Sequence, residues 1–192
     1  PSAEFETDLA RVVPDAWPAE LNERGLLSAE TERGLSRVVC FSPDHSLTLG
    51  RMSAAEIRRV VDVWAAQYEE LGALPFIKNV QIFENRGEMM GASNPHPHCQ
   101  IYATNFVFRT IEIEAQAAAE HLAEHGRVLF ADIIDAEEAD GRRVLVQRES
   151  ALSFVPYLAR SPYATYVAPP APPPRLPALS APPGGASASP PR

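Results

Sequence analysis

Hydrophobic and polar positions follow clear periods in the first half of the chain. Residues 37–41 are rich in β-branched and apolar side chains and stop at a proline-containing turn, which predicts a strand ending in a turn. Ser53 and Glu56 have the spacing of a capping box, and the apolar positions that follow recur at helical spacing until Gly72. The following positions predict one face of a helix: Ile57, Val60, Val61, Trp64, Tyr68 and Leu71.

Further along the chain, strand-like segments and helix-like segments follow one another. Strands are predicted over residues 77–84, 100–108, 143–148, 151–157 and 163–167, and helices over 109–125 and 128–139. The first of these helices is rich in alanine and glutamate and is followed by Gly126. Strands joined by turns, with helices inserted between them, predict an α+β domain on a largely antiparallel sheet.

The two ends of the chain lack this patterning. Residues 1–34 are polar and show no sustained period, so we expect an irregular segment with one short helix. Residues 169–192 contain only Pro, Ala, Ser, Gly, Leu and Arg, which cannot bury enough apolar surface to offset the entropy of ordering. We therefore expect a domain over 1–168 and a disordered tail over 169–192. The tail is either an ordinary one or the product of a coding frame lost near Pro169.

Composition narrows the classes of function. The chain has 192 residues, of which 45% are hydrophobic, and this suffices for one core of ordinary size. A formal net charge of -8 without a basic cluster argues against binding nucleic acid through its phosphates, although backbone N–H groups can still hold a small phosphate ligand. The sequence has neither a long apolar run nor a signal-peptide pattern, so we expect a soluble, cytoplasmic protein without membrane contact. Cys40 and Cys99 fit neither a disulfide framework nor a zinc knuckle and are expected to be reduced.

The candidate chemistry lies around His96, His98 and Gln100. Prolines at positions 95 and 97 exclude a helix, and side chains two residues apart in an extended segment share a face, so these three side chains are expected on one face. A neutral imidazole is both a good nucleophile and a common zinc ligand, which leaves both roles open. Small residues precede the run and can offer backbone amides to a phosphate: Gly91, Ala92 and Ser93.

Together with this motif, four stretches of the chain resemble the galactose-1-phosphate uridylyltransferase family of the histidine-triad superfamily. The stretches are residues 36–46, 83–87, 90–100 and 154–163. The most specific part is the pattern His-Pro-His-x-Gln at 96–100. The resemblance covers residues 35–168 and implies a histidine-triad-like antiparallel sheet with flanking helices.

The resemblance implies a two-step transfer reaction. His98 would attack the α-phosphorus of UDP-glucose to form a uridylyl-histidine, and galactose 1-phosphate would then accept the uridylyl group to give UDP-galactose. Gln100 would assist and would mark the transferase branch, since the nucleotide hydrolases of the superfamily resemble His-x-His-x-His. Residues implied around the nucleotide phosphates are Asn85, Gly91, Ala92, Ser93 and Gln100. The alternatives are a nucleotide hydrolase of the same superfamily and an inactive nucleotide-binding or metal-binding remnant.

The resemblance also implies metals and an assembly. His45 and His96 match zinc ligands that act with a Cys-x-x-Cys pair, a pair that this sequence lacks. Glu114 matches a ligand to a second metal, iron or zinc, in some members. The partner histidines of that site lie in the second half of those proteins, so the alternative role of Glu114 in this chain is an exposed glutamate on a helix. Family members are longer homodimers with two related halves, and this chain corresponds to most of the first half. We therefore expect the chain alone to turn over UDP-glucose and hexose 1-phosphate weakly or not at all.

Overall fold

The structure is a computed structural model that describes residues 4–8, 20–23, 27–30, 32–92 and 94–169. The described chain divides into two compact units, the first ending at Phe108 and the second beginning at Arg109. Helices combined with antiparallel sheets confirm the predicted α+β class. The predicted boundary of the tail stays a prediction, because residues 170–192 lie outside the described part of the chain.

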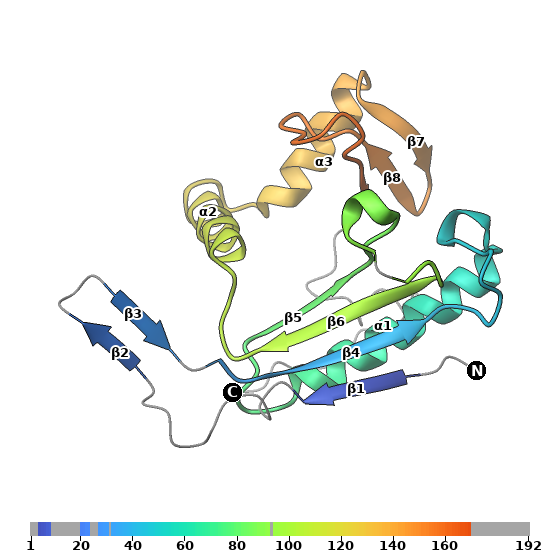
Figure 1. The fold of residues 1–192 in the computed structure, drawn as a ribbon. Helices are drawn as coiled ribbons and strands as arrows, with labels where there is room; N and C mark the ends of the chain where they lie inside the picture. Colours follow the sequence, from blue (N-terminus) through green and yellow to red (C-terminus); the bar gives the residue numbers. More distant parts are fainter. Residues whose placement is uncertain (1–3, 9–19, 24–26, 31, 93, 170–192) are drawn as a thin grey trace. The chain divides into compact units, whose positions relative to one another are not determined.

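The first unit is built on a four-stranded antiparallel sheet with the order β1-β4-β6-β5 (Figure 1). Its strands are β1 (Glu4–Asp8), β4 (Gly34–Cys40), β5 (Asn79–Phe83) and β6 (His98–Thr104). The other described elements of this unit are the hairpin β2 (Glu20–Glu23) and β3 (Leu27–Glu30), the short helices η2 (Leu49–Arg51) and η3 (Glu88–Met90), and the helix α1 (Ala54–Gly72). The predicted strands over 37–41, 77–84 and 100–108 are confirmed as β4, β5 and β6, of which β6 begins and ends earlier than predicted.

The irregular structure predicted for residues 1–34 is wrong where the structure describes this segment, because residues 4–8, 20–23 and 27–30 form strands. The short helix predicted in the same segment stays a prediction, because residues 9–19 and 24–26 lie outside the described part. β1 pairs with β4 from Glu4 opposite Val39 to Asp8 opposite Leu35. This pairing joins backbone groups about thirty positions apart, and such a partner leaves no period in the local sequence. The alternation of apolar and polar residues in the sequence therefore could not reveal these strands.

Helix α1 packs on one face of the sheet and begins where the capping box predicts. The Ser53 hydroxyl accepts from the Glu56 backbone N–H, and the Glu56 carboxylate accepts from the Ser53 backbone N–H at 2.8 Å. The buried core between helix and sheet consists of Val39, Leu71, Cys99, Ile101 and Ala103. At Gly34 the strands approach so closely that a Cβ atom would lie 2.4 Å from the Ala103 carbonyl oxygen, so only glycine fits there.

The described part of the second unit contains two helices and a three-stranded antiparallel sheet with the order β7-β8-β9. Its elements are α2 (Arg109–His125), α3 (Leu129–Asp140), β7 (Val144–Arg148), β8 (Ala151–Phe154) and β9 (Tyr166–Ala168). All five were predicted from the sequence, α2 with the same bounds. The buried core consists of Ile134, Leu152, Phe154 and Ala168.

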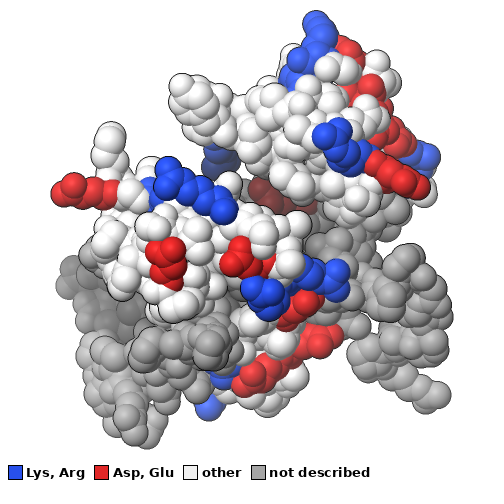
Figure 2. All heavy atoms as spheres, turned by 90° about the vertical axis from the view of Figure 1, so that its right-hand side faces the viewer, with Lys and Arg blue, Asp and Glu red and all other residues white. Residues whose placement is uncertain are grey.

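Charged side chains of both signs are interspersed on one face of the described residues. On the face seen in Figure 2, blue and red side chains lie next to one another on the described residues, and neither sign forms a continuous field there. None of the described helices has the length and apolar character that a membrane span requires.

Candidate functional site

The strand pair β4 and β6 presents His98 and Gln100 to a cavity in the first unit. Cys40 lies opposite His98 in the antiparallel register, and Val38 lies opposite Gln100. Burial alternates along β6, because the side chains between these positions point into the core below α1. The cavity measures about 350 Å³ and is lined by Val38, Cys40, Asn85, Gly91, Ala92, Asn94, His98 and Gln100.

The imidazole of His98 is held in one orientation by its own chain. Its Nδ1 atom lies 2.7 Å from the backbone carbonyl oxygen of His96, and His98 is half-buried. A carbonyl oxygen only accepts hydrogen bonds, so Nδ1 must carry the proton and donate it. In the neutral ring this leaves the lone pair on Nε2, which is the form that attacks an electrophile.

The wall opposite the strands comes from the loop between β5 and β6. It supplies Asn85, Gly91 and Ala92, three of the residues predicted around the nucleotide phosphates, and it also supplies Asn94. Gly91 has φ 77, a left-handed conformation that favours glycine and follows the short helix η3. Ser93, the remaining predicted residue of this group, lies outside the described residues.

Three residues of the cavity were not among the predicted site residues. Val38 and Cys40 line it because they lie opposite Gln100 and His98 across the strand pair. Asn94 lies in the loop just before His96. The alternation along β4 places Val38 and Cys40 in the same phase, but only the register shows which residues of β6 they face.

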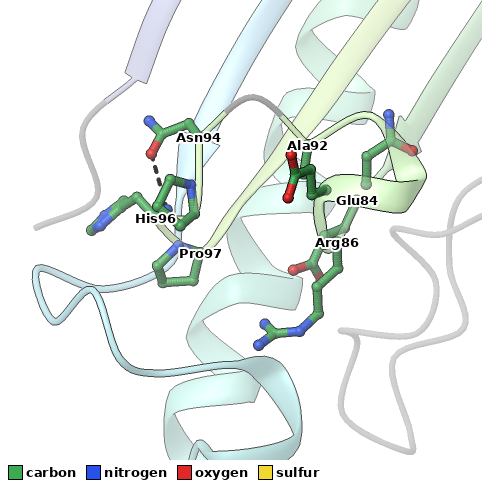
Figure 3. A pocket seen from close by; sticks show the side chains of 10 residues that line it. Glu84, Arg86, Ala92, Asn94, His96 and Pro97 are labelled. Carbon is green, nitrogen blue, oxygen red and sulfur yellow. Dashed lines mark hydrogen bonds between the residues drawn. The ribbon is translucent and has the colours of Figure 1, made fainter.

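His96 lies in a neighbouring cavity rather than beside His98. The Asn94 side-chain oxygen accepts from the His96 backbone N–H at 3.0 Å, which turns the chain before β6 begins. Figure 3 shows Asn94, His96 and Pro97 on one side of this cavity and Glu84, Arg86 and Ala92 on the other. The expected common face therefore holds for His98 and Gln100, which share a cavity, while His96 points into a second cavity of about 520 Å³.

The side chains of His45 and His96 meet, as a shared metal site requires. Their Nδ1 atoms are 2.8 Å apart, and their ring planes stand at 71° to one another. The turn that carries His45 is fixed by Asp44, which accepts from the backbone N–H and hydroxyl of Ser46, and the backbone hydrogen bond lowers the pKa of this carboxyl.

The donor set at this pair is compatible with zinc but incomplete among the described residues. Two zinc-bound nitrogens in a tetrahedral site are about 3.3 Å apart at bond lengths of about 2.0 Å, so the two rings would have to separate slightly. Structural zinc usually needs four protein ligands. No group of three or more His, Cys, Asp or Glu side chains in the described part of the chain is arranged to hold an ion. Glu114 lies exposed on α2, in the second unit.

The two cysteines are both free, as predicted, but they occupy opposite faces of the sheet. Cys99 is buried in the core, where its sulfur accepts a hydrogen bond from the Trp64 indole N–H at 3.1 Å. Burial raises the pKa of the Cys99 thiol to about 11. Cys40 is half-exposed and lines the cavity of His98.

We expect iodoacetamide to modify Cys40 in the folded chain and Cys99 only after unfolding, because the reagent reacts with an accessible thiolate. Mass spectrometry of peptides from native and denatured samples measures both reactions. A Cys40→Ala variant serves as the control and should take up no label while folded. Labelling of Cys99 at the same rate as Cys40 in the native chain would contradict the buried position of Cys99.

The fold and this cavity define a histidine-triad-like protein, in which an antiparallel strand presents an oriented histidine beside a glutamine. The model of the family described as galactose-1-phosphate uridyl transferase, N-terminal domain, matches residues 3–107. The chain therefore belongs to the galactose-1-phosphate uridyl transferase family, and the predicted resemblance is confirmed.

Known relatives support this family membership in both sequence and structure. Galactose-1-phosphate uridylyltransferase of Haemophilus influenzae is 41% identical over 165 residues, which cover 86% of this chain and 47% of the relative. The rat enzyme of the same name is 38% identical over 92% of this chain and 46% of its own length. A solved uridylyltransferase structure superposes with a TM-score of 0.73 at 26% identity, over 87% of this chain and 53% of that one. The chain thus spans about half the length of the curated relatives it matches.

Proposed function

We propose that this chain is part of a protein that transfers a uridylyl group from UDP-glucose to galactose 1-phosphate through a covalent intermediate on His98. The observation that carries the proposal is the hydrogen bond from His98 Nδ1 to the His96 carbonyl, which leaves Nε2 as the nucleophile in a polar cavity. Membership of the family supplies the reaction class, and relatives named galactose-1-phosphate uridylyltransferase suggest the substrates.

The reaction proceeds in two displacements at the same phosphorus. In the first, His98 Nε2 forms a bond to the α-phosphorus of UDP-glucose, and the bond from this phosphorus to the bridging oxygen breaks, which releases glucose 1-phosphate. In the second, a phosphate oxygen of galactose 1-phosphate attacks the same phosphorus and the phosphorus–nitrogen bond breaks. UDP-galactose leaves and His98 regains its free lone pair.

Neighbouring residues act on the phosphate in this scheme. The Gln100 side-chain amide donates a hydrogen bond to a non-bridging oxygen, and the Asn85 amide can do the same from the facing loop. An amide has no ionisable proton, so Gln100 cannot act as a general acid or base. This property favours transfer to a sugar phosphate over hydrolysis of the intermediate, and it separates the proposal from the nucleotide hydrolase alternative.

The direct test uses UDP-glucose that is radiolabelled in the uridylyl group. We expect the protein to become covalently labelled on His98 with release of glucose 1-phosphate, and galactose 1-phosphate should remove the label as UDP-galactose. For this chain alone we expect the first half-reaction with little turnover. A protein of the full family length that takes up no label would overturn the proposal.

We propose further that His45 and His96 are zinc ligands and that the remaining ligands come from outside the described residues. The convergence of the two Nδ1 atoms supports this assignment. Zinc would tie the turn after β4 to the segment before β6 and so fix the position of the His96 carbonyl. Cytoplasmic location, a homodimer and a second metal at Glu114 stay predictions.

Metal analysis of purified protein tests the zinc assignment. In a protein of the full family length we expect about one zinc per chain in the wild type and a loss of at least about tenfold in affinity when His45 is replaced by alanine, because one ligand disappears. His125→Ala is the matched control, because this exposed histidine lies on α2 in the second unit. Equal zinc retention by His45→Ala and the wild type would contradict the assignment.

A further inference from the structure

Tyr102 follows His98 and Gln100 on the same face of β6, and its hydroxyl contacts Gln100. The side chains of these three residues share a phase in the strand, because they are spaced by two. The Tyr102 hydroxyl donates a hydrogen bond to the Gln100 side-chain oxygen Oε1 at 3.2 Å. Tyr102 is outside the set of residues that line the cavity of His98, whereas Gln100 is within it.

The direction of this hydrogen bond decides what Gln100 can offer to a ligand. A side-chain amide has an accepting oxygen end and a donating NH₂ end, and it can turn about its last torsion to exchange them. The oxygens of a phosphodiester only accept hydrogen bonds. A hydroxyl that donates to Oε1 therefore leaves the NH₂ group of Gln100 as the end available to the phosphate.

The ring of Tyr102 is itself held in place. It packs edge-to-face on Phe83 with ring centroids 5.0 Å apart and an interplanar angle of 87°. Phe83 ends β5 and lies opposite Gln100 in the register of β5 and β6. The hydroxyl thus projects from a packed ring, although the side chain is 36% exposed.

We propose that Tyr102 is a positioning residue that fixes the orientation of the Gln100 amide so that its NH₂ group faces the transferred phosphate. This assignment rests on the proposed function and deepens it by adding a residue that acts through Gln100 without touching the substrate. The Tyr102→Phe variant removes only the hydroxyl and keeps the ring contact with Phe83, so folding should be unaffected. Tyr163→Phe is the matched control, because Tyr163 is 92% exposed and lies in the second unit.

A first measurement does not depend on turnover. The side-chain amide resonance of Gln100 is identified in an ¹⁵N-labelled chain by its loss in Gln100→Ala. We expect this resonance to shift in Tyr102→Phe and to stay unchanged in Tyr163→Phe, because a hydrogen bond to Oε1 polarises the amide. An unchanged resonance in Tyr102→Phe would overturn the assignment.

A second measurement connects the contact to chemistry. We expect the rate of uridylylation of His98 by UDP-glucose to fall about fivefold in Tyr102→Phe, the equivalent of one neutral hydrogen bond. In a Gln100→Ala background the same substitution should have no further effect, whereas a merely structural role of Tyr102 would add its own loss. If His98 is uridylylated equally fast in the wild type and in Tyr102→Phe, the positioning role is refuted. If a wild-type protein of full family length never takes up the uridylyl label, the proposed function is refuted. In that case the amide resonance of Gln100 still tests whether Tyr102 donates a hydrogen bond to Gln100.

Discussion

Replacement of His98 by alanine is expected to reduce covalent uridylylation by roughly a thousandfold or more, because the nucleophile itself is removed. No other imidazole in the described residues lines the same cavity. His96, the nearest histidine in sequence, points with its Nδ1 atom toward His45 and lines a different cavity, so it cannot take over the attack. The measurement is incorporation of radiolabel from UDP-glucose under single-turnover conditions.

The matched control for this experiment is His125→Ala, which removes an imidazole from the second unit and should leave the labelling rate unchanged. The thermal midpoint of His98→Ala should remain close to that of the wild type, since His98 is only half-buried and contributes one hydrogen bond to a carbonyl. Retention of label by His98→Ala would show that another residue is the nucleophile and would refute the proposed intermediate.

Local sequence signals predicted those elements whose determinants lie within a few residues. The start of α1 was predictable because both partners of its capping box, Ser53 and Glu56, lie in one turn. The bounds of α2 were predictable for a related reason, since Gly126 follows it with φ 67 and ends the helical run. The strand β1 was not predictable, because its determinant is a pairing with the distant strand β4.

The distinction between local determinants and distant pairing also applies to the candidate site. The sequence predicted His98, Gln100, Asn85, Gly91 and Ala92, and the structure brings all five to one cavity. These residues lie in one motif or in the loop that precedes it, so their proximity is partly built into the sequence.

Residues that reach the site through pairing between strands escaped prediction. Cys40 is adjacent to His98 only because β4 and β6 are in a particular register. Tyr102 was predicted to lie in a strand, but its contact with Gln100 depends on the side-chain conformation that Phe83 supports. Sequence pattern gives the phase of such residues along a strand and does not give their partners.

A buried polar cluster between α1 and the sheet leads to a second prediction, which concerns the free energy of unfolding. Arg37 on β4 is 9% exposed, and its guanidinium donates to the Gln67 side-chain oxygen at 2.6 Å and to the Glu70 carboxylate at 2.8 Å. Gln67 is itself 5% exposed, so its amide relies on partners within the protein rather than on water. The hydrogen bond from Arg37 also lowers the pKa of the Glu70 carboxyl, because it favours the charged form.

Arg37→Ala is therefore expected to lower the free energy of unfolding by about 3 kcal/mol, because it removes a buried partner of Gln67 and leaves a cavity beside α1. Urea titration followed by tryptophan fluorescence measures the loss, since Trp64 of α1 contacts the sheet through Cys99. Arg58→Ala is the matched control, because Arg58 is 59% exposed in an i,i+4 pair with Asp62, and its loss should cost less than about 0.5 kcal/mol. Equal stability of Arg37→Ala and Arg58→Ala would show that the buried cluster does not hold α1 on the sheet.

His98 and Gln100 lie on the opposite face of that sheet from Arg37. We therefore expect the Arg37→Ala chain to take up uridylyl label at low temperature, where it is still folded. This result would separate the stability of the fold from the chemistry of the site.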